Sequence, residues 1–308
     1  MHTPTPSPAP AGRRISVVLT TTRPWPEAAG ALRSVYAQAV AHDGEVILAD
    51  ATGLALPARH EMRELRHLVL PNANVFRLRS AGLAAARGAV VALTEDHCAV
   101  APDWVVAVLR AHAEHPTAGV IGGAVLNGAR ERLVDWANFF VSNEASLPPM
   151  RVRAGPDITG QANVSYKRDV LARYPDDALD EGRFRRALVR DGVPLVADDR
   201  IVVSHIQSLS VRESLTIHFH DGRCVAAAHR ARSTTREQAA AVVKGLAWGL
   251  RVPLAAARIV ARTLADRPAY RCTALACAPW MLSLVAFHKA GELVGALAGA
   301  GRSPDHMR

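Results

Sequence analysis

The sequence predicts an α/β fold with a mainly parallel central sheet flanked by helices. Short apolar runs alternate with longer segments of helical composition, and polar residues follow the apolar runs. The chain has 308 residues, of which 49% are hydrophobic and 21% are charged. A chain of this length and composition can bury one large core or two smaller ones, so it is not a disordered protein.

The first predicted element is a strand over residues 15–19, because its side chains are mainly aliphatic and a polar turn follows. Residues 28–40 are predicted to form a helix, since their apolar side chains gather on one face. A second strand covers residues 45–50 and ends at Asp50, directly before a turn.

The next elements repeat this alternation. Residues 68–70 are predicted to form a short third strand and residues 78–87 a second helix. Residues 90–93 then form the strand that leads into the polar cluster at 95–97. The order β-α-β-β-α-β predicts a mainly parallel sheet with helices on both faces.

Glu95, Asp96 and His97 are the most informative residues of the chain. They follow an apolar strand, and open α/β sheets bind their ligands at the carboxyl ends of strands. Their oxygen and nitrogen atoms suit a divalent cation, and such a cation suits a diphosphate. The alternative is an ordinary solvated strand end.

Several classes of protein are disfavoured. The four cysteines have no CxxC spacing, so we expect neither a structural zinc site nor disulfides. A reduced, cytosolic setting is therefore expected. Residues 1–14 lack the apolar core of a signal peptide and are expected to form a solvated tail. The absence of GxGxxG and Walker lysine motifs argues against dinucleotide-binding and P-loop sites.

The net charge of +9 is concentrated in the last quarter of the chain. From residue 230 onward there are 12 Lys or Arg and 4 Asp or Glu, a balance of +8, which leaves +1 for the preceding residues. The part that carries the 95–97 cluster is therefore nearly neutral, which argues against nucleic acid as a partner.

An ordered set of segments resembles family 2 inverting glycosyltransferases of the GT-A fold, over roughly residues 15–225. The segments are residues 15–19 with the following polar turn, residues 45–50, residues 79–88, and Glu95-Asp96-His97 followed by Pro102-Asp103-Trp104. The resemblance implies a GT-A domain over residues 15–228. It also implies that the 95–97 cluster is a DxD-type motif holding a divalent metal, Mn²⁺ or Mg²⁺, on a sugar-nucleotide diphosphate. Here His97 stands where the family usually has the last Asp.

The same resemblance assigns roles around the donor. Asp96 and His97 are the implied metal ligands, and His205, at the end of a predicted strand, is a third candidate. The implied nucleotide-binding residues are Thr20, Asp50, Arg79, Glu95 and Asp96. Asp50 would accept a hydrogen bond from the base imide, with an ordinary turn as the alternative. Arg79 could equally be a surface charge.

The second half supplies the implied acceptor site and base. Gly160, Gln161 and Asn163 match a family segment near the acceptor, where glycine permits close approach of a substrate. Inverting transfer needs one carboxylate to take the proton of the acceptor hydroxyl. Glu181 matches the family's base, with Asp180 as the second choice. The alternative is that both cap a helix.

Two histidines farther along remain open to several interpretations. His218 and His220 could line one face of a strand, and a zinc site is conceivable. We expect instead a loop that faces phosphate or acceptor, because no third zinc ligand has suitable spacing.

The C-terminal region, residues 229–308, has the composition of a membrane-associating segment. On a helix over residues 239–264, the cations Lys244, Arg251, Arg258 and Arg262 form one stripe beside an apolar face. This pattern suits an anionic membrane surface, and a helix packed on the enzyme is the alternative. Pro253 is expected to kink or split the helix.

Residues 272–287 are uncharged but shorter than a comfortable span. A re-entrant or interfacial hairpin is therefore expected here, with a single spanning helix as the alternative.

Taken together, these patterns predict transfer of a sugar, UDP-linked rather than GDP- or dTDP-linked, to a hydroxyl of a lipid-linked or cell-surface glycan. The expected location is the cytoplasmic face of the cell membrane, in peripheral or monotopic form. Two alternatives remain: an inactive membrane-bound scaffold of the same fold, to which the unusual His97 points, and a metal-dependent nucleotidyltransferase.

Overall fold

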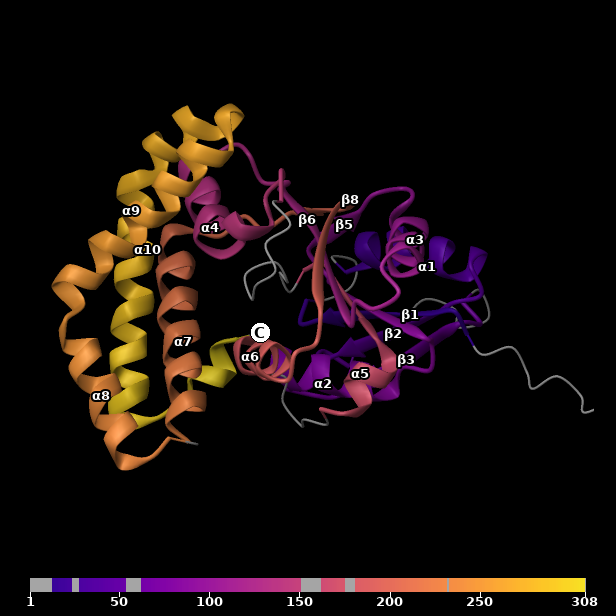
Figure 1. Ribbon diagram of the computed structural model, residues 1–308, viewed down its shortest axis with the longest axis horizontal. Helices are drawn as coiled ribbons and strands as arrows, with labels where there is room; N and C mark the ends of the chain where they lie inside the picture. Colours follow the sequence, from indigo (N-terminus) through magenta and orange to yellow (C-terminus); the bar gives the residue numbers. More distant parts are fainter. Residues whose placement is uncertain are drawn as a thin grey trace, which may run out of the picture.

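The central feature of the computed structural model is one eight-stranded sheet (Figure 1). The structure describes residues 13–23, 28–53, 62–150, 162–174, 181–231 and 233–307. The strands lie in the order β3 (Leu65–Val69), β2 (Glu45–Asp50), β1 (Ile15–Thr21), β4 (Val90–Glu95), β7 (Val164–Lys167), β6 (Val120–Asn127), β8 (Leu195–His205) and β5 (Cys98–Val100).

The sheet is mixed, although most neighbouring strands are parallel. β3, β2, β1 and β4 form a parallel block, as the alternation of elements predicts. β7 runs antiparallel to both of its neighbours, β6 is parallel to β8, and β5 is antiparallel to β8. The α/β class with helices on both faces is confirmed, and the reversal of β7 adds the mixed character.

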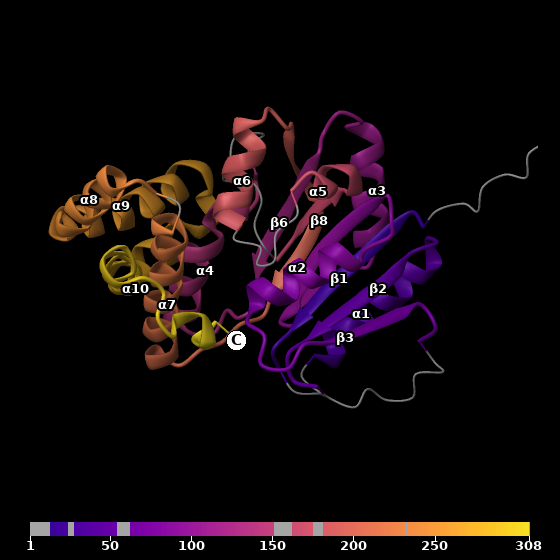
Figure 2. The ribbon, with the colours of Figure 1, turned by 90° about the horizontal axis from the view of Figure 1, so that it is seen from below.

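Helices cover both faces of this sheet (Figure 2). On one face lie α1 (Ala29–Ala41) and α3 (Trp104–Glu114), and on the other lie α2 (Val75–Ala85), α5 (Arg168–Ala172) and α6 (Glu181–Arg190). Val17 and Leu19 of β1 belong to the first core, and Val18 between them belongs to the second. Successive side chains of a strand point to opposite faces, and helices cover both faces of this sheet. The sequences of its strands are therefore continuously apolar.

A group of helices lies beside one edge of the α/β unit (Figure 1). It consists of α4 (Leu133–Asn143), α7 (Val211–Arg230), α8 (Thr235–Leu246), α9 (Trp248–Asp266) and α10 (Arg271–Ala298). The expected loop or strand at His218 and His220 is wrong, since both lie inside α7. A capping box between Ser210 and Glu213 starts this helix, with the Ser210 hydroxyl accepting from the Glu213 N–H.

The helix expected over residues 239–264 is split, but not at Pro253. α8 and α9 meet at Ala247 with a bend of 77°. Pro253 is the sixth residue of α9, so the helix continues through it although one intrahelical hydrogen bond, to the Gly249 carbonyl, is missing.

The hairpin expected over residues 272–287 is also wrong. α10 continues through Pro279 for 28 residues, and its buried side chains pack against α4, α7 and α9. A glycine allows the closest approach, since a Cβ at Gly291 would lie 2.0 Å from the backbone oxygen of Phe219 in α7. Residues 268–298 have the length and mean hydropathy, 1.3, of a possible membrane span, and a third of the scored window is buried against the protein.

Candidate metal and donor site

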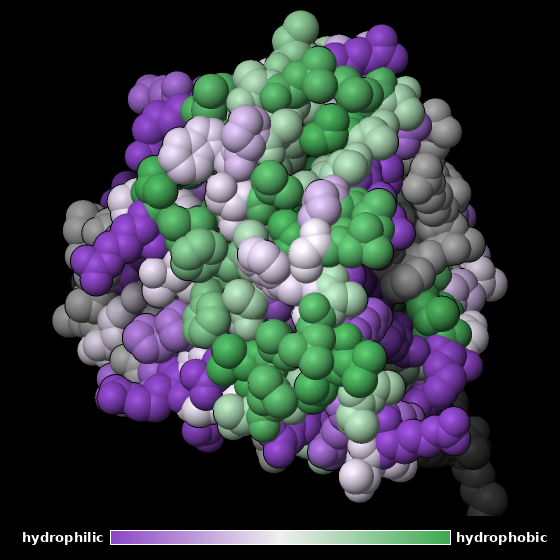
Figure 3. All heavy atoms as spheres, turned by 90° about the vertical axis from the view of Figure 1, so that its left-hand side faces the viewer, coloured by the Kyte–Doolittle hydropathy of each residue, from purple (hydrophilic) through white to green (hydrophobic). Residues whose placement is uncertain are grey.

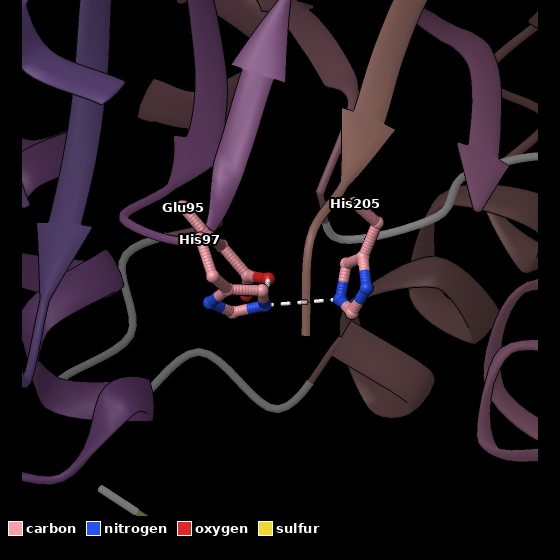
Figure 4. Close-up of side chains that lie close together, drawn as sticks. All are labelled: Glu95, His97 and His205. Carbon is pink, nitrogen blue, oxygen red and sulfur yellow. Dashed lines mark hydrogen bonds and ion pairs between the residues drawn. The ribbon is translucent and has the colours of Figure 1, made fainter. Parts of the chain in front are cut away.

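Three potential metal ligands converge at the carboxyl edge of the sheet (Figure 4). Glu95 ends β4, His97 lies in the turn before β5, and His205 ends β8. The antiparallel pairing of β5 with β8 places Cys98 opposite His205, which brings His205 beside the preceding residue, His97. One ligand atom from each of the three side chains lies within 4.8 Å of the other two.

The contacts among these side chains are direct. The Nε2 atoms of His97 and His205 are 2.9 Å apart, with the rings edge to face, and Oε2 of Glu95 lies 3.2 Å from Nε2 of His97. Burial lowers the pKa of His97, but hydrogen bonds to Asp96 and Glu95 outweigh it and raise this pKa to about 9. Burial and the charge of His97 lower the pKa of His205 to about 4. At neutral pH a protonated His97 therefore donates to a neutral His205.

Two imidazole nitrogens and one carboxylate oxygen fit a divalent transition metal. Mn²⁺ accepts both donor types, whereas Mg²⁺ prefers oxygen ligands and retained water. Glu95 is held in its charged form: burial raises its pKa, but the Arg79 guanidinium and His97 bring it well below its usual range. The donor set thus fits the cation expected from the sequence.

Asp96 lines the same cavity and contacts Nδ1 of His97 through Oδ1 (2.9 Å), and its expected role as the main metal ligand stays a prediction. Its Oδ2 accepts hydrogen bonds from the Thr21 hydroxyl (2.9 Å) and from the N–H groups of Thr22 (3.0 Å) and Arg23 (3.2 Å). These bonds tie the end of β4 to the loop after β1. In the described group of potential ligands, Glu95 takes the place that the sequence-based expectation gave to Asp96.

The other expected nucleotide-binding residues separate into two sets. Thr20 and Arg79 line the same cavity as Glu95, and Arg79 is a buried ion-pair partner of Glu95 rather than a surface charge. Asp50 is not among the described residues that line this cavity. Its carboxylate accepts from the N–H and hydroxyl of Thr52 (2.7 and 2.6 Å) and contacts His67 (2.9 Å).

The cavity has a volume of about 720 Å³ and extends from the metal-ligand cluster to the C-terminal helices. This volume lies in the range of ordinary ligand sites. Six Lys or Arg side chains and five carboxylates line it, and the cations can contact the negative charges of a ligand. The arginines and lysine that line it are Arg23, Arg79, Arg185, Arg186, Arg262 and Lys289.

The expected acceptor and base residues are only partly described. Gly160, Gln161 and Asp180 lie outside the described residues, and Glu181 is described only as the first residue of α6. Asn163 is 1% exposed. Its carboxamide donates to the carbonyls of Ala124 and Ile201 (both 2.8 Å) and accepts from Trp104 (2.9 Å).

Asn163 is thus a buried structural residue in this arrangement, and its expected contact with the acceptor stays a prediction. Gly123 makes room for it, since a Cβ there would lie 2.3 Å from the Asn163 amide nitrogen.

Sequence reasoning missed the residues that form the far wall of the cavity. Glu144 follows α4, while Arg262 of α9 and His288 and Lys289 of α10 come from segments more than a hundred residues away. No local pattern marks these residues, because only helix packing brings them together. His218, also in the lining, is held by Asn138 of α4 (3.1 Å).

Comparisons with known proteins agree with this geometry. The model of the family described as "Glycosyl transferase family 2" matches residues 16–174, just over half of the 308 residues. No curated protein matches the chain.

Among solved structures, the chain is similar to the mannosyltransferase PcManGT from Pyrobaculum calidifontis, solved with GDP-Man and Mn²⁺. The TM-score is 0.56 and the identity 17%, over 94% of this chain and 89% of that one. GalNAc-T7, solved with UDP, GalNAc and Mn²⁺, matches with a TM-score of 0.46 and 16% identity, over 64% of this chain and 44% of that one. The first likeness supports the GT-A fold.

Proposed function

Because the chain belongs to glycosyl transferase family 2, we propose that it is an inverting glycosyltransferase with a nucleotide-diphosphate sugar as donor and a glycan hydroxyl as acceptor. The observation that carries this proposal is the convergence of Glu95, His97 and His205 at one end of the cation-lined cavity. A nucleotidyltransferase or an inactive scaffold with this fold is the alternative.

The donor diphosphate is proposed to lie between the metal-ligand cluster and the arginines of the cavity. A divalent cation, Mn²⁺ or Mg²⁺, held by Glu95, His97 and His205 would neutralise charge on the leaving diphosphate. Arg79 keeps Glu95 ionised. Arg23 also lines the cavity, and its Nε lies 3.7 Å from Oδ1 of Asp96. Thr20 and Asp50 are proposed to contact the nucleoside, with uracil as the base.

The acceptor oxygen forms a bond to the anomeric carbon while the bond from that carbon to the diphosphate breaks. The bonding electrons leave with the diphosphate, and the acceptor proton goes to a carboxylate. We assign this base to Glu181, with Asp180 as the alternative. Support comes from α6, which starts at Glu181 and supplies Arg185 and Arg186 to the cavity lining.

The acceptor is proposed to be lipid-linked or part of a cell-surface glycan, assembled at the cytoplasmic face of the membrane. Gly160 and Gln161 remain its proposed contacts in the α/β unit. The opposite wall of the cavity supports an amphipathic acceptor, since it combines apolar side chains with the cations Arg262 and Lys289. The apolar residues of that wall are Val225, Ala255, Ile259 and Val285.

Calorimetric titration with UDP, with and without Mn²⁺, tests the donor site. We expect binding that depends on the metal and is weaker for GDP. A protein that binds no nucleotide in the presence of Mn²⁺ would contradict the enzyme proposal and favour the scaffold.

Replacement of the base tests the mechanism. Glu181→Gln should abolish sugar transfer from a UDP-sugar while UDP binding stays within about twofold of wild type, because the amide cannot accept the proton. Glu131→Gln, an exposed position outside the cavity lining, is the control and should remain active. Full turnover by Glu181→Gln would show that another residue is the base. Formation of a UDP-sugar from UTP and a sugar 1-phosphate, with release of diphosphate, would favour the nucleotidyltransferase.

A further inference from the structure

The bend between α8 and α9 exposes a concentration of large apolar side chains. Within residues 243–254, here called the elbow, five such side chains are between 42% and 68% exposed. They are Val243 (67%), Leu246 (68%), Trp248 (42%), Leu250 (66%) and Leu254 (45%). Figure 3 views this side of the molecule, where hydrophobic side chains gather between hydrophilic ones. Single exposed leucines are common, but five in twelve residues indicate a binding surface.

The exposed side chains are not needed for the packing of these helices. Val252, Ala256 and Ile259 of α9 are buried in the core that α10 completes, and Gly245 of α8 lies against Leu293. The inner faces therefore already have partners, and the 77° bend turns the outer faces toward solvent.

The surroundings of the elbow are basic. Residues 235–271 contain seven Lys or Arg and two Asp or Glu, a balance of +5. Lys244 lies within the elbow, and Arg236, Arg258 and Arg271 are exposed on the flanking helices. An apolar surface bordered by cations is complementary to the boundary between anionic lipid headgroups and acyl chains.

We propose that the elbow inserts into one leaflet of an anionic membrane, with α8 and α9 lying in the interface rather than crossing it. A second copy of this chain is a poor occupant, because a symmetric dimer would place two surfaces bordered by exposed cations against each other. Lipid headgroups supply the opposite charge instead.

The contacts of α10 explain why the chain lies on the membrane and does not span it. His288 of α10 contacts Asp221 of α7 (3.3 Å) and Glu292 (3.2 Å), and Glu292 also contacts Arg251 of α9 (3.3 Å) and Lys289. A spanning α10 would either break these ion pairs or carry the charged α7 into hydrocarbon, at several kcal/mol.

The elbow also relates the membrane to the cavity. Ala255, Ile259 and Arg262 of α9 line the cavity, while Leu250 and Leu254 of the same helix face outward. The cavity and the proposed lipid surface thus lie on two sides of one helix. Because they are so close, a lipid-linked acceptor would reach the cavity without leaving the membrane. This consequence rests on the proposed function; membrane binding itself does not.

Flotation of the full chain with vesicles tests the proposal. We expect the protein to float with vesicles of phosphatidylcholine and phosphatidylglycerol, and much less with phosphatidylcholine alone. The double variant Leu246→Glu with Leu250→Glu should lower the partition coefficient more than about tenfold, because two apolar side chains become charged. Both positions are exposed, so thermal melting should match wild type.

The matched control places the same charges on the α/β unit. Val40→Glu with Val106→Glu changes two side chains that are each 41% exposed, on α1 and α3, and should leave partitioning within about twofold of wild type. Equal loss in both variants, or no flotation of the wild type, would overturn the proposal. So would a wild-type dimer that the elbow variant dissociates, or retention in host membranes after alkaline carbonate, which indicates a spanning chain. None of these readouts depends on sugar transfer.

Discussion

Removal of Glu144 tests what joins the C-terminal helices to the α/β unit. Its carboxylate is 4% exposed; it accepts a hydrogen bond from Arg267 Nη1 at 2.5 Å and forms an ion pair with Arg262 Nη2 at 2.9 Å. Arg267 also donates from Nε to the Leu147 carbonyl at 2.8 Å. Glu144 lies just after α4, whereas both arginines belong to the segment at the end of α9, so this ion pair crosses the junction.

The magnitude follows from burial. Arg267 is 6% exposed, so Glu144→Ala leaves a buried guanidinium without its carboxylate, and we expect the free energy of unfolding to fall by about 3–5 kcal/mol. The Arg262 side chain is 42% exposed, so Arg262→Ala should cost at most about 1 kcal/mol. Replacing both partners, Glu144→Ala with Arg267→Met, should cost less than the sum of the single changes, by at least about 2 kcal/mol.

Urea denaturation of Glu144→Ala, Arg262→Ala, Arg267→Met, the double variant and the wild type measures these differences. The reasoning is refuted if Glu144→Ala loses less than about 1 kcal/mol, or if the double variant loses the full sum. Either result would mean that the junction is held by apolar packing and that water solvates the guanidinium of Arg267 after the change.

Three further predictions concern buried contacts and use the same denaturation assay. Asn163→Ala should cost about 2–4 kcal/mol, because Trp104 and two backbone carbonyls lose their partner; a loss below 1 kcal/mol would argue for water in its place. Gly291→Ala should cost about 1–3 kcal/mol through the contact with Phe219, and a neutral effect would contradict the close packing of α7 and α10. Burial lowers the pKa of His288, but Asp221 and Glu292 raise it to about 9, so its stabilising charge is present below pH 6.5 and lost as pH rises through 9. His288→Gln should therefore destabilise at pH 6, by up to about 3 kcal/mol, and little at pH 9.5; an equal effect at both pH values would exclude this linkage.

The local patterns predicted the α/β unit well for a physical reason. Strands of a doubly covered sheet are apolar along their whole length, so residues 15–19, 45–50 and 90–93 stand out from the polar turns after them. The boundaries were less accurate at the edge of the sheet, where β3 begins at Leu65 and its side chains are only partly buried. Partial burial relaxes the demand for apolar residues, which weakens the pattern.

The C-terminal predictions failed where interactions between helices decided the structure. The spacing of His218 and His220 suits one face of a strand, and a loop was expected because no third zinc ligand has suitable spacing. The capping box of Ser210 and Glu213 instead starts a helix that contains both. The short uncharged run over residues 272–287 suggested a hairpin, but α10 continues through Pro279 because α4, α7 and α9 bury one side of it. The cost of one missing hydrogen bond is small beside that packing.

By itself, the sequence determined that a strand ends in Glu95-Asp96-His97, because the hydrophobic pattern is local. It also predicted a ligand at this edge, because open α/β sheets bind ligands at the carboxyl ends of their strands. Only the tertiary structure decided which of the two acids faces the histidines. Both acids contact His97, but at different ring nitrogens: Asp96 lies at Nδ1 and is also bonded to the Thr21 hydroxyl, whereas Glu95 lies at Nε2, on the side of His205. His205, the third potential metal ligand, lies 108 residues from His97 in the sequence. The pairing of β5 with β8 places it beside His97, and no local pattern predicts that pairing.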